Sequence, residues 1–98
     1  MKNPLNIAFV WHMHQPNYKD PSTGQYLLPW VLLHATKDYL DMATILDDFP
    51  DIKQTFNLTP VLLEQIIEYS SGEVDDKFRS VSIKPANELN ISDRVFIL

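Results

Sequence analysis

Apolar residues along this chain follow two spacings, and the alternation between the two predicts strands and helices in turn. A continuous apolar run from Ile7 to Trp11 leads into His12-Met13-His14-Gln15-Pro16. A short run of this kind is typical of a strand buried on both faces, as in a parallel sheet. The face expected to pack beneath helices carries Ile7, Phe9, Trp11 and Met13, and the opposite face carries Ala8, Val10, His12 and His14.

The middle of the chain predicts a helix, a second strand and another helix. Residues 35–48 show a helical apolar stripe formed by Ala35, Tyr39, Met42, Ala43 and Leu46. Residues 52–58 predict the second strand. Thr59-Pro60 then supplies an N-cap and a proline at the first helical position, and Gly72 suits a left-handed C-cap. The side chains that this second helix is expected to bury are Leu62, Leu63, Ile66 and Ile67.

The segment from Asn17 to about Leu33 is predicted to be a long loop over the end of the first strand. Asp20-Pro21-Ser22-Thr23-Gly24 is typical of a turn, because proline restricts φ and glycine accepts positive φ. The loop carries Tyr18, Tyr26 and Trp30, whose rings would either stack on a flat ligand or pin the loop to the domain. Tyr18 lies nearer the histidines, which favours a role in a site.

The last quarter of the chain predicts two short helices. Val74, Phe78 and Val81 have helical spacing, and Asn90 with Asp93 forms a variant of the capping box. Strand, helix, strand and helix make a βαβα unit with parallel strands. Two parallel strands with uncovered edges do not complete a sheet. We therefore expect the N-terminal part of a larger, truncated α/β domain, or a chain that finds its missing strands elsewhere.

His12 and His14 are the strongest candidates for function. The carboxyl ends of parallel strands form the floor of active sites in α/β folds, and both imidazoles lie on one face at that end. Asn57 closes the second strand in the same way. Polar side chains that end a buried strand need partners that an apolar core does not provide.

Composition narrows the classes of partner. The 98 residues are 45% hydrophobic and 21% charged with a net charge of −5, which is ordinary for a soluble domain. Eight scattered Lys and Arg residues argue against nucleic acid as a partner. The absence of cysteine excludes disulfides and thiolate sites. No run has the length of a membrane span or the character of a signal peptide, so we expect no membrane partner and a cytoplasmic location.

An ordered set of segments resembles glycoside hydrolase family 57, the family of α-amylases, amylopullulanases and 4-α-glucanotransferases. The segments, which fall within residues 7–69, are Trp11-His12-Met13-His14-Gln15-Pro16, Asp20-Pro21-Ser22-Thr23-Gly24, Leu28-Pro29-Trp30, His34-Ala35-Thr36-Lys37-Asp38-Tyr39 and Thr55-Phe56-Asn57-Leu58-Thr59-Pro60. His-Gln-Pro alone would be weak evidence, whereas the ordered set is specific.

The resemblance implies that residues 1–98 are the N-terminal fragment of a catalytic domain built as an incomplete (β/α)7 barrel. It implies an α-glucan or maltooligosaccharide as substrate, no cofactor, and retaining chemistry with a glutamate nucleophile and an aspartate acid/base. In the family both carboxylates come from later segments, so the isolated chain is expected to be inactive. Retention requires two carboxyl groups about 5 Å apart across the scissile bond.

Carried over by position, the resemblance places His14, with His12, at the sugar ring beside the cleaved bond. The other residues expected to bind substrate are Gln15, Tyr18, Trp30 and Asn57. Asn17 departs from the family, which often has an aromatic residue directly after the proline.

Two alternatives remain open. A His-x-His pair at the end of a first barrel strand also holds metal in hydrolases of the amidohydrolase, deacetylase and α-mannosidase types. The other alternative is a truncated, non-catalytic chain that forms a homo-oligomer through its unpaired strands or its apolar C-terminus.

Overall fold

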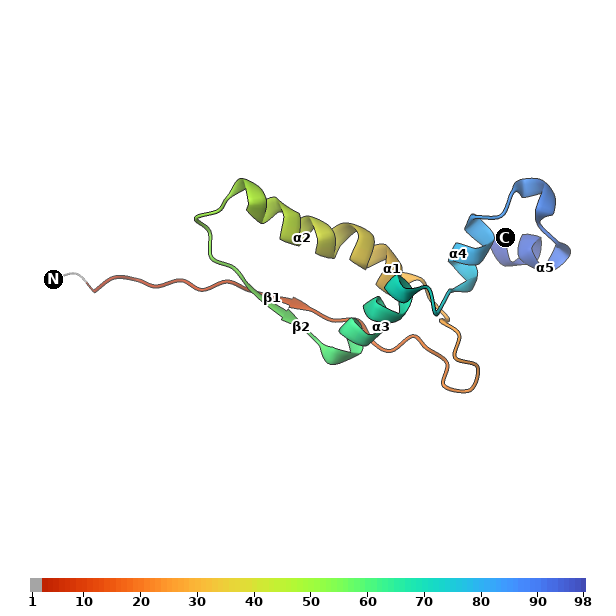
Figure 1. Ribbon diagram of the computed structural model, residues 1–98, viewed down its shortest axis with the longest axis horizontal. Helices are drawn as coiled ribbons and strands as arrows, with labels where there is room; N and C mark the ends of the chain where they lie inside the picture. Colours follow the sequence, from red (N-terminus) through yellow and green to blue (C-terminus); the bar gives the residue numbers. More distant parts are fainter. Residues whose placement is uncertain (1–2) are drawn as a thin grey trace.

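Two parallel strands form the centre of the molecule in the computed structural model, which describes residues 3–98 (Figure 1). Strand β1 is Val10–Met13 and strand β2 is Thr55–Leu58. Their register pairs Val10 with Thr55 and His12 with Asn57. The predicted mixed α/β chain with parallel strands is therefore confirmed.

Both strands are shorter and more exposed than the sequence predicts. Pairing begins only at Val10, and Ile7 and Phe9 are 70% and 59% exposed. Of the face expected to lie under helices, Met13 is buried and Trp11 is partly buried against Phe56, with ring centroids 5.5 Å apart. The expectation of a strand buried on both faces was wrong, because within residues 3–98 each strand has only the other as a neighbour.

A continuous helical segment connects the two strands and begins earlier than predicted. It consists of α1 (Trp30–His34), a π-helical turn η1 (Ala35–Tyr39), α2 (Leu40–Thr44) and a 3₁₀ turn η2 (Ile45–Asp48). The predicted start at Ala35 was wrong by five residues. Since the first turn follows Pro29 directly, the preceding loop ends there rather than at Leu33.

Helix α3 (Pro60–Ser71) follows β2 after a single residue. Pro60 opens the helix and Gly72 ends it at φ 75°, as predicted. Thr59 occupies the N-cap position, but its side chain makes no capping hydrogen bond, and its buried hydroxyl has no partner within residues 3–98. Thr59 is thus the N-cap residue as predicted, but the hydrogen bond expected of its side chain is not formed.

The core is small and joins one residue from each of three elements: Met13, Val31 and Leu62. The partly buried side chains that pack against it are Tyr18, Tyr39, Met42, Phe56, Ile66 and Tyr69. Leu63 and Ile67 were expected to be buried, yet they are 41% and 62% exposed. They lie on α3 where no described element covers them.

The C-terminal part consists of α4 (Lys77–Ser82), the 3₁₀ turn η3 (Ala86–Glu88) and α5 (Ile91–Ile97). Figure 1 shows this part at the end of the molecule opposite the N-terminus. The predicted capping box is confirmed: Asn90 accepts a bond from the Asp93 amide at 2.8 Å, and Asp93 accepts one from the Asn90 amide at 3.3 Å.

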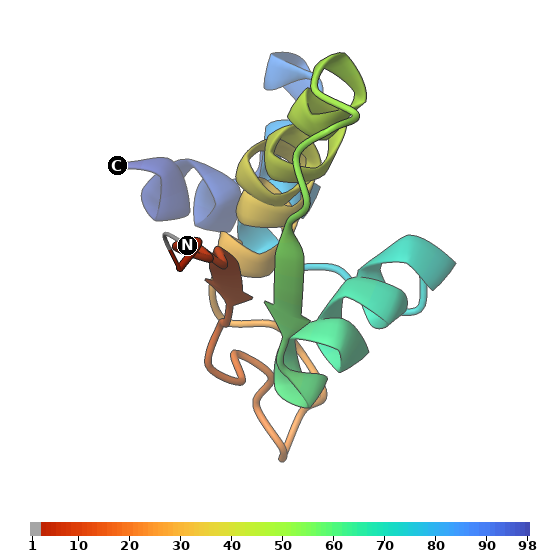
Figure 2. The same ribbon diagram turned by 90° about the vertical axis from the view of Figure 1, so that its left-hand side faces the viewer.

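The molecule is elongated, measuring 73 × 30 × 25 Å with a radius of gyration of 18.9 Å. A compact domain of this length would have a radius of gyration of about 13 Å. Figure 2, turned by 90°, shows β1 and β2 side by side. Among residues 3–98 no helix has both the length and the apolar character that a membrane crossing requires.

Candidate functional site

His12 and Asn57 form a direct pair across the two strands. They occupy the same register position, and Nδ1 of His12 lies 2.5 Å from Oδ1 of Asn57. Because a carboxamide oxygen only accepts hydrogen bonds, this contact assigns the hydrogen to Nδ1. The Nε2 atom of a neutral His12 is then an acceptor, suited to a hydroxyl donor.

His14 lies beside His12 on the same face. The two imidazole rings are nearly parallel, with centroids 6.1 Å apart and an interplanar angle of 8°. Both side chains are exposed, as is Asn57. The structure therefore brings three of the predicted residues into one open polar surface where the two strands end.

The amide of Gln15 is held between two tyrosines. Tyr18 donates its hydroxyl hydrogen to Oε1 of Gln15 at 2.9 Å, and Nε2 of Gln15 donates to the Tyr39 hydroxyl at 3.1 Å. The Tyr39 hydroxyl in turn donates to the carbonyl oxygen of His14 at 3.4 Å. Gln15 and Tyr18 thus fix the backbone next to the histidines, and Tyr18 also packs against the core.

Tyr39 reaches this network from the π-helical turn η1. Residues five apart face one another in a π-helix, and the rings of His34 and Tyr39 are stacked with centroids 6.0 Å apart. The apolar pattern predicted Tyr39 as a core residue, and no role was predicted for its hydroxyl. A helical period alone carries no signal for a π turn, so this contact was not predictable from the pattern.

Trp30 lies on α1 and not in the loop, which corrects its predicted setting. Its ring centroid is 6.4 Å from that of His34, so Trp30, His34 and Tyr39 form a row of rings along the helix. The indole is 44% exposed. That row connects Trp30 to the segment beside the histidines, because Gln15 is bonded to its last member, Tyr39.

Tyr26 anchors the loop rather than facing a ligand. Its buried ring packs against Tyr69, and its hydroxyl donates to Oε2 of Glu68 at 2.7 Å. Burial, with the Glu68 carboxylate beside it, raises the pKa of Tyr26. The hydrogen bond from Lys19, at 2.8 Å, and then that from Tyr26 lower the pKa of Glu68. The loop is thus tied to α3 by an ion pair and a buried phenol.

The predicted turn in this loop is confirmed. Gly24 has φ 72°, and its amide donates to the Asp20 carbonyl at 2.7 Å. The Asp20 carboxylate accepts hydrogen bonds from the amide and hydroxyl of Ser22. These bonds lower the pKa of Asp20, the hydroxyl bond most strongly.

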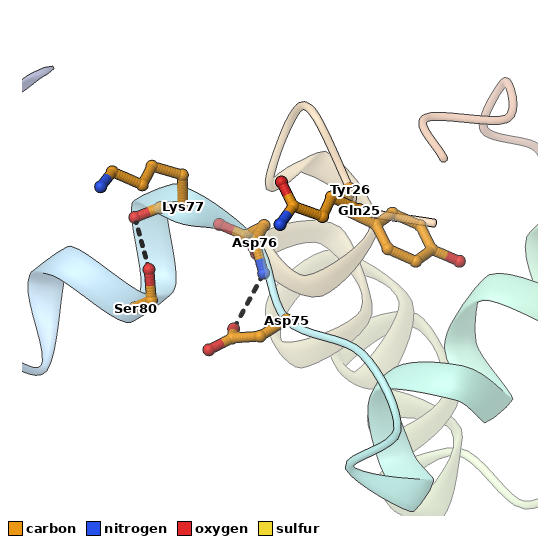
Figure 3. Close-up of a pocket in the computed structure, with 6 residues that line it drawn as sticks. All are labelled: Gln25, Tyr26, Asp75, Asp76, Lys77 and Ser80. Atoms are coloured by element: carbon orange, nitrogen blue, oxygen red, sulfur yellow. Dashed lines mark hydrogen bonds between the residues drawn. The ribbon is translucent and has the colours of Figure 1, made fainter. Parts of the chain in front are cut away.

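Several carboxylates outside the histidine surface are paired with neighbouring side chains. On the connecting helix Asp38 lies 2.5 Å from Nδ1 of His34, and Asp41 pairs with Lys37. Two more line a cavity of about 180 Å³ between the loop and α4 (Figure 3). There Asp75 pairs with Arg79 at 3.1 Å.

Asp76, the other carboxylate of that cavity, has both oxygens bonded. One accepts the Arg79 amide at 2.8 Å and the other accepts the Tyr69 hydroxyl at 2.9 Å. Figure 3 shows the Tyr26 hydroxyl pointing away from Asp75 and Asp76. The two carboxylates of this cavity therefore serve a helix cap and an ion pair, and they do not contribute to the histidine surface.

Within residues 3–98 no three His, Cys, Asp or Glu side chains gather closely enough to hold one metal ion. His12 and His14 could thus supply at most part of a ligand set. The pairing of His12 with an amide oxygen leaves its other ring nitrogen for a ligand.

Nearly the whole chain matches the model of one protein family. The model described as Glycosyl hydrolase family 57 matches residues 8–97. The chain belongs to this family. No curated protein and no solved structure matches it. Membership of family 57 confirms the resemblance seen in the sequence, and it indicates a glycosidase type of function with carbohydrate as the substrate class.

Proposed function

We propose that residues 1–98 are the N-terminal part of a retaining family 57 catalytic domain that hydrolyses or transfers α-glucans, and that they contribute sugar-binding side chains. These side chains are the ones expected from the sequence: His12, His14, Gln15, Tyr18, Trp30 and Asn57. The observation that carries the proposal is the convergence of His12, His14 and Asn57 where β1 and β2 end.

The chemistry of that surface suits a sugar. Pyranose rings present hydroxyl groups, which donate and accept hydrogen bonds at once. His12 offers Nε2 as an acceptor while Asn57 holds its Nδ1. His14 adds a second ring in parallel. The roles differ within the set, since Gln15 and Tyr18 would act by holding His14 and Trp30 would provide an outer stacking face.

The barrel is part of the same proposal. A βαβα segment whose strands are parallel is compatible with the start of an incomplete (β/α)7 barrel. Further strands would pair with the outer edges of β1 and β2. They would also cover the exposed apolar side chains of Ile7, Phe9 and Ile67.

We infer that the catalytic carboxylates come from segments other than these 98 residues. Retaining hydrolysis needs two carboxyl groups facing one bond. Here Asp38, Asp41 and Glu68 are paired with His34, Lys37 and Lys19. The isolated chain is therefore expected to bind α-glucan without cleaving it.

The test is a titration of the full chain with maltotetraose, followed through the imidazole signals of His12 and His14 by NMR. Saturable shifts at both histidines are expected. Cellotetraose, which has the same sugars in β linkage, is the matched control and should shift the signals less. Absence of a shift in a folded sample, together with a response to Zn²⁺, would contradict the glucan site and favour the metal-binding alternative.

A further inference from the structure

Gln65 is a buried glutamine whose side-chain amide contacts the loop that follows the histidines. It lies in the middle of α3 and is 2% exposed. Its Oε1 accepts a hydrogen bond from the Tyr18 amide at 3.0 Å. Its Nε2 donates to the carbonyl oxygens of Pro16 at 3.0 Å and Val61 at 2.9 Å. One side chain thus bonds the loop on both sides of Asn17.

These three contacts determine the orientation of the amide. Two carbonyl oxygens face Nε2 and one N–H faces Oε1, so a flipped amide would place like groups together. A buried amide without partners is costly, and here both N–H groups and the oxygen are used. The geometry of Pro16 and Tyr18 is therefore coupled to helix α3.

The coupled segment carries the proposed sugar-binding residues. His14 and Gln15 directly precede Pro16, and the Tyr18 hydroxyl bonds to Gln15 at 2.9 Å. The Tyr39 hydroxyl contacts Gln15 and the His14 carbonyl. Residues 14–18 are thus hydrogen-bonded both to α3 and to the π-helical turn η1, although the loop itself has no regular structure there.

We propose that Gln65 is a positioning residue, which holds residues 16–18 and, through Gln15, the orientation of His14 towards the bound sugar. The inference rests on the proposed glucan site but concerns a residue that does not touch the ligand. Polar residues behind a binding site commonly orient the residues that make contact, and small displacements weaken binding.

The variant Gln65→Met removes all three hydrogen bonds and keeps a similar side-chain length. Without sugar, we expect faster hydrogen exchange of the Tyr18 amide and a shifted His14 imidazole signal. With maltotetraose, we expect roughly tenfold weaker binding. This is the order expected when a displaced His14 loses one or two hydrogen bonds to the sugar. In Gln65→Glu the oxygen facing Tyr18 remains but the donor to Pro16 is lost, so the Tyr18 amide should stay more protected than in Gln65→Met.

Two controls separate positioning from loss of stability. Ile66→Ala removes a neighbouring core contact of the same helix, and Gln25→Met makes the same exchange at an exposed loop residue. At a temperature where every variant is folded, both should bind maltotetraose like the parent chain. Equal weakening in Gln65→Met and Ile66→Ala would overturn the positioning role, as would an unchanged Tyr18 exchange rate in Gln65→Met. The exchange and imidazole measurements need no sugar, so they decide this inference even if the parent chain fails to bind maltotetraose.

Discussion

At the scale of single residues, the pairing of His12 with Asn57 is the feature with most chemical consequence. The register of β1 and β2 places the two side chains opposite each other, 45 residues apart in sequence. Asn57 sets the tautomer of His12 and so decides whether Nε2 accepts or donates. In the proposed site, Asn57 would therefore act on the sugar both directly and through His12.

The first prediction follows from this pair. Asn57→Ala should weaken maltotetraose binding roughly fivefold, because about 1 kcal/mol of net hydrogen bonding is lost. Stability should change little, since Asn57 is exposed. Isothermal titration calorimetry and thermal unfolding measure the two effects. Thr55→Ala on the same strand face is the control, and weakening of equal size in both variants would count against a specific role.

At the scale of elements, local signals determined where α3, α4 and α5 lie. Pro60 and Gly72 bound α3, and Asp76 caps α4 by accepting the Arg79 amide. Asp93 combines capping with long-range contact, because its buried carboxylate also accepts from Lys77 at 2.9 Å and Lys84 at 2.7 Å. One side chain thus joins α4 to α5.

The second prediction concerns the pH dependence of that junction. Hydrogen bonds from Lys84 first, then Lys77, lower the pKa of Asp93 from an ordinary 3.8 to about 2. A carboxyl whose pKa is lower in the folded state stabilises above its unfolded pKa, and this contribution is lost as the pH falls from about 4 towards 2.

The measurement compares the parent chain with Asp93→Asn by urea unfolding monitored at several pH values. The variant should be the less stable above about pH 5, and the difference should shrink below about pH 4. Asp47→Asn, at an exposed position, is the control. A stability difference that does not vary with pH would refute the electrostatic part of the argument.

At the scale of the whole molecule, many large apolar side chains are exposed and few are buried. The core holds few side chains, whereas Phe9, Trp11, Ile45, Phe49 and Ile52 line an open apolar cavity of about 390 Å³. Burial of such surface is the main driving force for association. The proposed barrel would cover it with further strands, and the isolated chain has only other copies of itself.

The third prediction is that the isolated chain self-associates. Its melting temperature should rise with protein concentration, because association stabilises the folded state by mass action. Phe9→Ser should reduce the association measured by sedimentation, since Phe9 is exposed and lies outside the Met13–Val31–Leu62 core. Ser92→Ala, an exposed position on α5, is the control. A concentration-independent melt of a monomer would contradict the prediction.

Much of the site was predictable because it depends on short segments. His12, His14 and Asn57 were expected together, since the ends of parallel strands coincide in space. Tyr39 and Gln65 were not expected: a π turn has no clear sequence pattern, and a glutamine inside a helix looks like a surface residue. Their partners, Gln15 and Tyr18, are distant in sequence.

The sequence by itself determined which segments form strands and helices, the caps at Gly72 and Asn90, the turn at Gly24 and membership of family 57. These depend on a residue and its near neighbours, so local chemistry suffices. Only the tertiary structure decided where the helix after Pro29 begins, that Tyr26 anchors the loop, and which amides hold residues 14–18. Such features arise when distant segments pack, and the contacts of Tyr26 and Gln65 give buried polar groups the partners that they need.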